Sequence, residues 1–161
     1  MPEMLTLNLP ARRNEKLRQL VARIDADVEL HTLWDCANVN AVERAGITDH
    51  GSVHIKIVAN IALKLLRLLL DADVPMGIVQ DHGLTNDEAE IVVVLAACLH
   101  DLGISIHRSG HEQYSLFLAE RKARELLDEL YGVRDRTILV AETLHAIIAH
   151  RWDVACLTTE A

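Results

Sequence analysis

The sequence predicts an all-α protein of six or seven helices. Hydrophobic residues make up 50% of the chain but aromatic residues only 3%, so the core must be built from Leu, Val, Ile and Ala, which suits packed helices. Only 7 glycines and 3 prolines interrupt the 161 residues. This length fits one domain, 1–161, in which N-terminal helices (1–47) precede a core (48–161) that holds the candidate chemistry.

Two helices are expected in the N-terminal part. Pro10 marks entry to a helix over 11–26, whose apolar residues recur at the spacing of one helix face: Leu17, Leu20, Val21 and Ile24. A second helix is expected over 27–45, and Gly46 ends it. His31 lies within this helix and is interpreted as structural or exposed.

The third helix is expected to start at a cap, Thr48 or Asp49, and to run to about Asp71. His50 and His54 stand four residues apart, which would place both on one helix face, within reach of one ion. The alternative is that His50 is a polar first-turn residue and only His54 faces inward. A broad apolar face follows and is expected to be buried: Ile55, Ile57, Val58, Ile61, Ala62, Leu65, Leu66 and Leu69.

The central helix is expected to end at His100 and Asp101. A connection over 73–83 with a short helical turn comes first, and His82 within it is expected to be solvated. Thr85 with Glu88 three residues later is a capping box. The β-branched run 91–94 could instead be a buried strand, but the cap, the Ala/Leu-rich continuation and the lack of other strand candidates favour a helix.

Two more helices are expected after a loop over 104–110. The first runs from 111 to about 131, where Gly132 stops it, and the second runs over 134–150. His145 and His150 are five residues apart and do not share a face, so at most one of them is a primary ligand. The segment 153–161 is short, and its last residues, 157–161, resemble the start of a further helix.

Charge and cysteine content narrow the class of protein. The net charge of −8 argues against binding of a nucleic-acid polymer through a basic surface, but it leaves room for a small phosphorylated ligand held by a metal. The three cysteines, Cys36, Cys98 and Cys156, form no CxxC pair and fit a reducing compartment. No secretory signal and no run long enough to span a bilayer is found, so a cytoplasmic location is expected.

The pair His100-Asp101 is the focus of the candidate chemistry. It closes the most apolar run of the chain, 91–99, where two adjacent polar side chains need compensation. A metal ion would provide it, because imidazole nitrogen and carboxylate oxygen are both ligands for divalent metals. The alternative is a helix end that reaches water, with Asp101 solvated and His100 a core histidine that has its hydrogen bonds satisfied.

Several segments together resemble the HD superfamily of metal-dependent phosphohydrolases. The segment 99–103, LHDLG, resembles the family's namesake motif, and His54 with Val58 and Ala59 resembles its first histidine segment. His111 with Ser115, and Ala146-Ile147 with His150, resemble the further histidine segments of members that hold two metals. The likeness covers roughly residues 49–161.

The resemblance implies a ligand set. His54, His100 and Asp101 would bind one divalent metal, and Asp101 would bridge to a second ion held by His111 and His150. His50 and His145 would be outer or substitute ligands. One or two ions are implied, and Mn, Fe, Zn, Ni, Co and Mg are not distinguished.

One element of the family pattern is missing. The family has a further aspartate on a later helix, whereas this sequence stops at Ala161, and the nearby Asp153 lies in a different context. The expectation is a weakened metal site, with apolar surface left exposed that favours self-association.

The function implied is hydrolysis of a phosphomonoester or phosphodiester in a small molecule such as a nucleotide. Asp101 would take part in the chemistry, and Arg108 and Arg151, each close to a proposed ligand, could clamp a phosphate. Two alternatives remain: a non-catalytic ligand-binding or regulatory module, and a di-iron oxygenase of the same fold.

Overall fold

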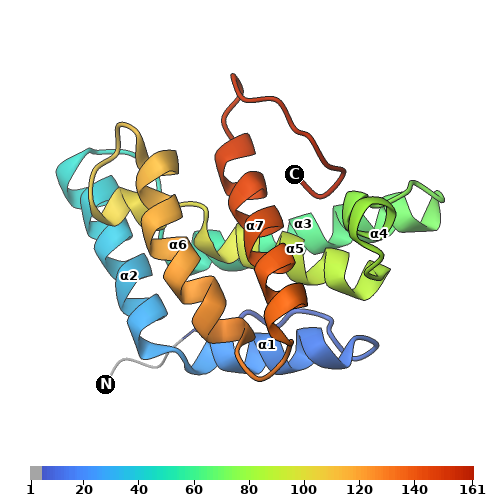
Figure 1. Ribbon diagram of the computed structural model, residues 1–161. Coiled ribbons are helices and arrows are strands. Elements are labelled where there is room, and N and C mark those ends of the chain that lie inside the picture. Colours follow the sequence, from blue (N-terminus) through green and yellow to red (C-terminus); the bar gives the residue numbers. More distant parts are fainter. Residues whose placement is uncertain (1–4) are drawn as a thin grey trace.

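The computed structural model describes residues 5–161, and within that range it contains seven α-helices and no strand (Figure 1). The predicted all-α class is therefore confirmed. The α-helices are α1 (Glu15–Ala26), α2 (Val28–Asn38), α3 (Ser52–Asp71), α4 (Gly77–His82), α5 (Asn86–Leu99), α6 (His111–Leu127) and α7 (Val133–Ala149). A π-helix, η1 (Val39–Arg44), extends α2, and a 3₁₀-helix, η2 (Leu102–Ser105), follows α5.

Helix α5 lies at the centre of the molecule. It packs against α3 and α7 most extensively and also contacts α1, α4 and α6 (Figure 1). Eleven of its 14 residues are buried, which explains its apolar sequence. Residues 91–94 belong to this helix, so the strand alternative is excluded.

The start of α5 carries the capping box that the sequence predicted. The Thr85 hydroxyl accepts from the N–H of Asp87 (3.3 Å), and the Glu88 carboxylate accepts from the N–H of Thr85 (3.0 Å). The Tyr131 hydroxyl also donates to Glu88 (3.1 Å). These bonds fix the residue at which the buried helix begins. Because the length of the helix is set, they also fix the position of His100 and Asp101 at its other end.

Several helix boundaries differ from the prediction. Helix α1 begins at Glu15 rather than at residue 11, because the Asn14 side chain caps it by accepting from the N–H of Leu17 (3.0 Å). The second helix, α2 with η1, spans Val28–Arg44, close to the expected 27–45, but its part after Asn38 is a π-helix. The sixth helix ends at Leu127, short of the expected residue 131.

Helix α3 begins at Ser52, later than predicted. The Asp49 carboxylate accepts from the N–H groups of Gly51 (3.3 Å) and His54 (3.1 Å), so it caps the helix from a position before its start. His50 consequently lies in the turn before the helix, and its Nδ1 donates to the Thr48 carbonyl (2.6 Å). The prediction that His50 and His54 lie on one helix face is therefore wrong.

Only one face of α3 is buried. Ile55, Ala59, Leu63 and Leu66 are buried along it. Ile57, Ile61 and Leu65 remain 54%, 54% and 56% exposed. The expectation that the whole apolar surface is buried is wrong, because the helix is apolar on more faces than its neighbours cover. Self-association stays a prediction.

Residues 150–161 form no helix and pack as an irregular segment near α4. The Glu160 carboxylate is buried and accepts from the N–H groups of Gly77 (3.1 Å) and Ile78 (3.0 Å). The expected helix start at 157–161 is therefore wrong. Among the described residues, no helix is long and apolar enough to cross a membrane.

Candidate metal centre

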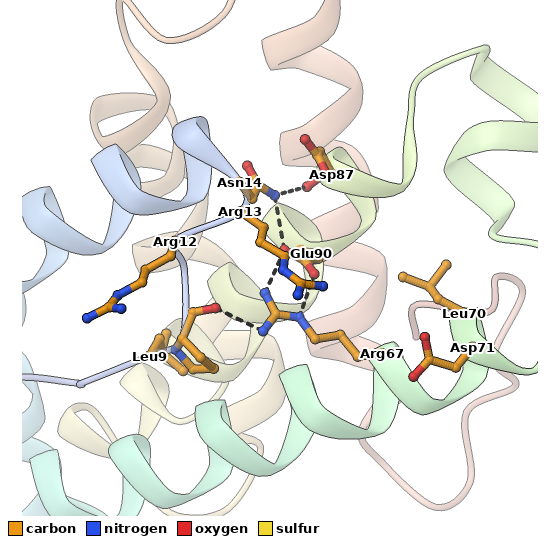
Figure 2. Close-up of a pocket in the computed structure, with 10 residues that line it drawn as sticks. Leu9, Arg12, Arg13, Asn14, Arg67, Leu70, Asp71, Asp87 and Glu90 are labelled. Atoms are coloured by element: carbon orange, nitrogen blue, oxygen red, sulfur yellow. Dashed lines mark hydrogen bonds and ion pairs between the residues drawn. The ribbon is translucent and has the colours of Figure 1, made fainter.

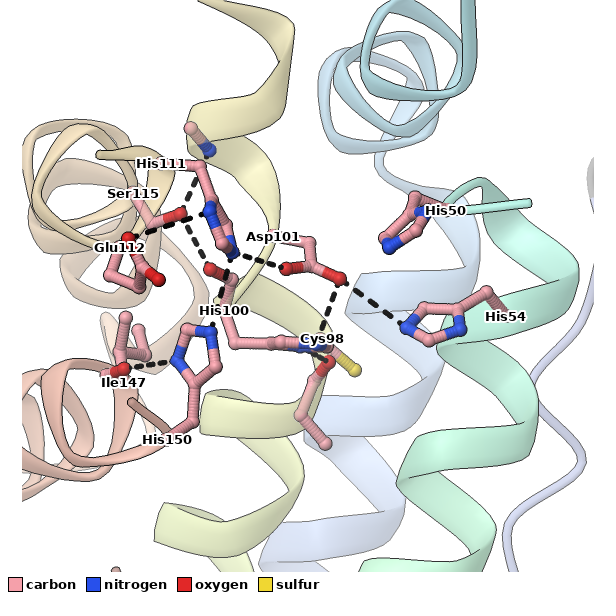
Figure 3. Close-up of polar contacts among 12 residues, drawn as sticks. His50, His54, Cys98, His100, Asp101, His111, Glu112, Ser115, Ile147 and His150 are labelled. Carbon is pink, nitrogen blue, oxygen red and sulfur yellow. Dashed lines mark hydrogen bonds and ion pairs between the residues drawn. The ribbon is translucent and has the colours of Figure 1, made fainter. Parts of the chain in front are cut away.

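Four helix ends bring their histidines to one point. His54 lies in the first turn of α3, His100 directly follows α5, His111 is the first residue of α6, and His150 directly follows α7. Asp101, next to His100, lies between them (Figure 3). The helices are packed on one another, so segments far apart in the sequence meet here.

Asp101 contacts three imidazoles. Its Oδ2 lies 2.9 Å from His100 Nε2 and 3.3 Å from His54 Nε2, and its Oδ1 lies 3.2 Å from His111 Nε2. His150 Nε2 lies 3.4 Å from His111 Nε2. Figure 3 shows the carboxylate at the centre, with His54 on one side and His111 on the other.

Two overlapping groups in this cluster could each hold a metal ion. One group is His54, His100 and Asp101, and the other is Asp101, His111 and His150; within each group the ligand atoms lie within 4.8 Å of one another. Asp101 belongs to both groups. All five residues that the sequence proposed as ligands thus lie in one cluster.

The hydrogen bonds of the ring nitrogens leave lone pairs that face the cluster. His100 Nδ1 donates to the Ala97 carbonyl (2.9 Å), and His150 Nδ1 donates to the Ile147 carbonyl. In the neutral form of each ring the proton is therefore on Nδ1, and Nε2 carries a lone pair. Backbone carbonyls orient metal-binding histidines in this way in many proteins.

These lone pairs need a cation. His100 Nε2 faces a carboxylate oxygen, and an acceptor facing an acceptor is repulsive unless a proton or a metal lies between them. His54 Nε2 is buried and makes no hydrogen bond even though Asp101 Oδ2 lies 3.3 Å away, which is costly for a polar atom. The donor set of imidazole nitrogens and one carboxylate is one that zinc, iron, manganese and similar ions accept. The residues present therefore fit a divalent metal.

The pKa shifts in the cluster describe the pair in which a proton on His100 Nε2 bonds to Asp101. Burial alone would raise the pKa of Asp101, but hydrogen bonds from His100 and His111 outweigh it and hold that pKa well below its ordinary value. Burial would lower the pKa of His100, but the adjacent Asp101 carboxylate raises it. For His54 and His150, burial dominates and lowers the pKa. Asp101 is thus an anion in the folded protein.

Hydrogen bonds from α6 fix the end of α5. The Ser115 hydroxyl donates to the His100 carbonyl (2.5 Å) and accepts from the N–H of Gly103 (2.8 Å). This contact joins the segment after α5 to α6 and so sets the distance between Asp101 and His111. Ser115 belongs to the segment that carried the family resemblance, but its role in joining α5 to α6 was not predicted, because the bonded backbone groups lie 12 and 15 residues away in the sequence.

The two arginines proposed as phosphate clamps lie in different surroundings. Arg108 reaches the cluster, since its Nη1 is 2.8 Å from His111 Nδ1. Arg151 is paired with the exposed Asp153 through two contacts of 2.8 and 2.7 Å. That carboxylate raises the pKa of Arg151. Asp153 is thus engaged with Arg151 and belongs to neither metal-binding group.

The remaining histidines lie outside the two groups. The His50 ring centre is 5.0 Å from that of His54, next to the cluster but without a contact to Asp101. His145 Nε2 accepts from the N–H of Leu157 (2.9 Å). His31 is buried against Trp34, and His82 pairs with Glu142 (3.0 Å) instead of being fully solvated as expected.

The chain is homologous to an uncharacterised protein, MJ1020, of Methanocaldococcus jannaschii. The two are 35% identical over 133 residues, which make up 83% of this chain and 51% of that protein. The chain therefore spans about half the length of this relative. No protein-family model and no solved structure matches the chain. This homology establishes relatedness and assigns no chemistry.

A large cavity of the described residues lies away from the histidine cluster. It has a volume of about 590 Å³ and lies between the segment before α1, the second half of α3 and the start of α5 (Figure 2). Asp101 lies beyond the other end of α5. Arg67 and Glu90 form an ion pair in the wall of the cavity (2.7 Å), and Asn14 donates to the same carboxylate (3.1 Å). No residue of the histidine cluster lines this cavity.

Proposed function

We propose that this chain is a metal-dependent phosphohydrolase of the HD superfamily, acting on a small phosphorylated substrate such as a nucleotide. The observation that carries the proposal is the position of Asp101, which belongs to both of the groups that could hold a metal ion. A shared carboxylate between two sets of imidazoles is suited to two neighbouring divalent ions. The order of the histidine segments along the chain supports the family assignment.

The residues of the cluster would form two sets of metal ligands. His54 and His100 with Asp101 would hold one ion, and His111 and His150 with Asp101 the other. A divalent ion held there lowers the pKa of bound water toward neutrality and neutralises phosphate oxygens. The burial of Asp101 and His111 limits competition from bulk water at these ligands.

Arg108 would bind a phosphate oxygen. A ligand on His111 Nε2 requires the ring proton on Nδ1, which can then donate to the Arg108 carbonyl 3.1 Å away. In that tautomer Nδ1 no longer accepts from the Arg108 guanidinium, 2.8 Å away. The guanidinium would then be free to form charge-assisted hydrogen bonds with the substrate.

Metal analysis and a substrate screen test this proposal. Protein purified without chelator should contain one or two divalent ions per chain, and with Mn²⁺, Ni²⁺ or Co²⁺ it should hydrolyse some members of a panel of phosphomonoesters and phosphodiesters. Asp101→Asn should lose both metal and activity, the latter by about 10³-fold or more, because both ion positions share this carboxylate.

A matched control exists on α7. His150→Ala should lose metal, whereas His145→Ala, five residues earlier and outside the cluster, should keep it.

Two other results would indicate a different function. Iron content with oxygen consumption and no phosphatase activity would indicate a di-iron oxygenase. Tight binding of a phosphorylated compound without turnover would indicate a regulatory module.

A further inference from the structure

A second, smaller cavity lies next to the cluster and is lined by basic groups. Its volume is about 330 Å³, and its lining residues are Asn40, Arg44, Ala45, Ile106, His107 and Arg108. None of them is acidic, although the chain as a whole carries a net charge of −8. A local excess of positive charge in an acidic protein attracts an anionic ligand.

Asn40 builds one wall of this cavity. Its side-chain nitrogen donates to the carbonyls of Ile104 (2.7 Å) and Ser105 (2.9 Å), which joins η1 to η2. Its side-chain oxygen accepts from Arg44 Nη1 (2.8 Å) and so orients the guanidinium. Arg44 has no carboxylate partner in the described part of the chain, and its other N–H groups remain available.

His107 adds a further donor. Its Nδ1 lies 3.0 Å from the N–H of Ser109 and 3.3 Å from the Ser109 carbonyl, and in the tautomer that accepts the shorter bond the proton is on Nε2. Together with the Arg44 and Arg108 guanidinium groups, this gives the cavity three side chains that can donate to phosphate oxygens. Guanidinium groups bind phosphate with two parallel hydrogen bonds, which adds both affinity and orientation.

Arg108 connects the cavity to the cluster. It lines the cavity, and its Nη1 lies 2.8 Å from His111 Nδ1. On the other side of the same ring, His111 Nε2 lies 3.2 Å from Asp101 Oδ1. Only one imidazole ring therefore separates the basic cavity from the carboxylate at the centre of the cluster.

We propose that this cavity binds a second phosphate group of the substrate while the first is held at the histidine cluster. The substrate class is then a small molecule with two phosphate groups, such as a nucleoside diphosphate or a sugar bisphosphate, rather than a simple monophosphate. The inference rests on the proposed function, because it assigns the reacting phosphate to the histidine cluster.

A selectivity ratio tests the proposal. It compares kcat/KM for a doubly phosphorylated substrate with kcat/KM for p-nitrophenyl phosphate, which has one phosphate. Arg44→Gln should lower this ratio on the order of tenfold, mainly through KM for the doubly phosphorylated substrate, because a charge-assisted contact is lost. Arg44→Lys should give an intermediate ratio. The control is Arg12→Gln, an exposed arginine at the distant large cavity, which should leave the ratio unchanged.

A binding measurement separates this inference from the proposed function. Calorimetry with inorganic pyrophosphate and protein freed of metal by EDTA should show binding that Arg44→Gln weakens on the order of tenfold and Arg12→Gln does not. Circular dichroism checks that each variant is folded.

Phosphatase activity with an unchanged selectivity ratio in Arg44→Gln would overturn the cavity assignment and leave the proposed function standing. Arg44-dependent pyrophosphate binding by a chain without phosphatase activity would support the cavity and overturn the function. Equal weakening by both variants would show nonspecific charge binding and overturn the cavity assignment.

Discussion

At the scale of single residues, Gly103 decides how closely the segment after α5 can approach α6. A Cβ built at this position would lie 2.0 Å from the His111 carbonyl oxygen and 2.5 Å from the Ser115 nitrogen. Both are backbone atoms of α6, which cannot move aside as a flexible side chain would. The glycine after the His-Asp pair is therefore required by the close approach that brings His111 to Asp101.

Gly103→Ala should accordingly destabilise the fold and open the cluster. We expect a loss of about 3 kcal/mol in the free energy of unfolding, at the upper end of the range for overpacking, because backbone rather than side chains must shift. Metal content should fall with it, measured on the folded fraction. Gly132→Ala is the control, since no heavy atom lies within 4 Å of its Cβ position. Equal stability of the two variants would contradict the argument.

At the scale of elements, local chemistry predicted α5 and its cap because Thr85 and Glu88 act within one turn. The boundaries that were missed depend on side chains that act from outside the helix. Asp49 caps α3 from three residues before its start, which removes His50 from the helix. The end of the second helix lies close to the expected residue 45, but its π-helical form after Asn38 has no signal in the spacing of its apolar residues. This segment is held by the bonds from Asn40 to the distant Ile104 and Ser105.

Helix α4 gives an element-scale prediction, because its own N-cap residue, Met76, offers no side-chain acceptor. The Glu160 carboxylate takes this role by accepting from two N–H groups at the helix start. Glu160→Ala should cost about 1 kcal/mol, as the loss of a helix cap does, and should speed hydrogen exchange at the amides of Gly77 and Ile78. Glu43→Ala, an exposed acidic residue on η1, should change neither. Unchanged exchange in Glu160→Ala would show that the contact does not stabilise α4.

At the scale of the whole molecule, the residues of the histidine cluster could be predicted from the sequence, but the basic cavity beside it could not. The residues of the cluster stand out because histidine at a helix end, next to apolar runs, is unusual, and their order along the chain adds information. Arg44 and His107 give no such signal, because an exposed basic residue is ordinary until the fold places it beside another. The basic cavity arises from the packing of η1 on η2, which no local pattern encodes.

Metal binding should stabilise the whole fold, since the ligands come from four helices and the unfolded chain does not hold them together. A divalent ion at about 100 times its Kd adds about 2.7 kcal/mol, which for this size corresponds to a rise in Tm of roughly 5–10 °C over EDTA-treated protein. His100→Ala should abolish most of that rise.

The rise in Tm should depend on pH, because protons compete with the metal for imidazole nitrogen. The pKa of His100 is raised, so this ring takes up a proton at a higher pH than an ordinary histidine, whereas the lowered pKa values of His54 and His150 keep those rings neutral to lower pH. The metal-induced rise should therefore be full at pH 8 and begin to decline before the pH falls to about 6.5, the ordinary histidine value. Differential scanning calorimetry of loaded and EDTA-treated protein at each pH measures it. A rise that is constant from pH 8 to pH 5, or that persists in His100→Ala, would place the metal at other ligands.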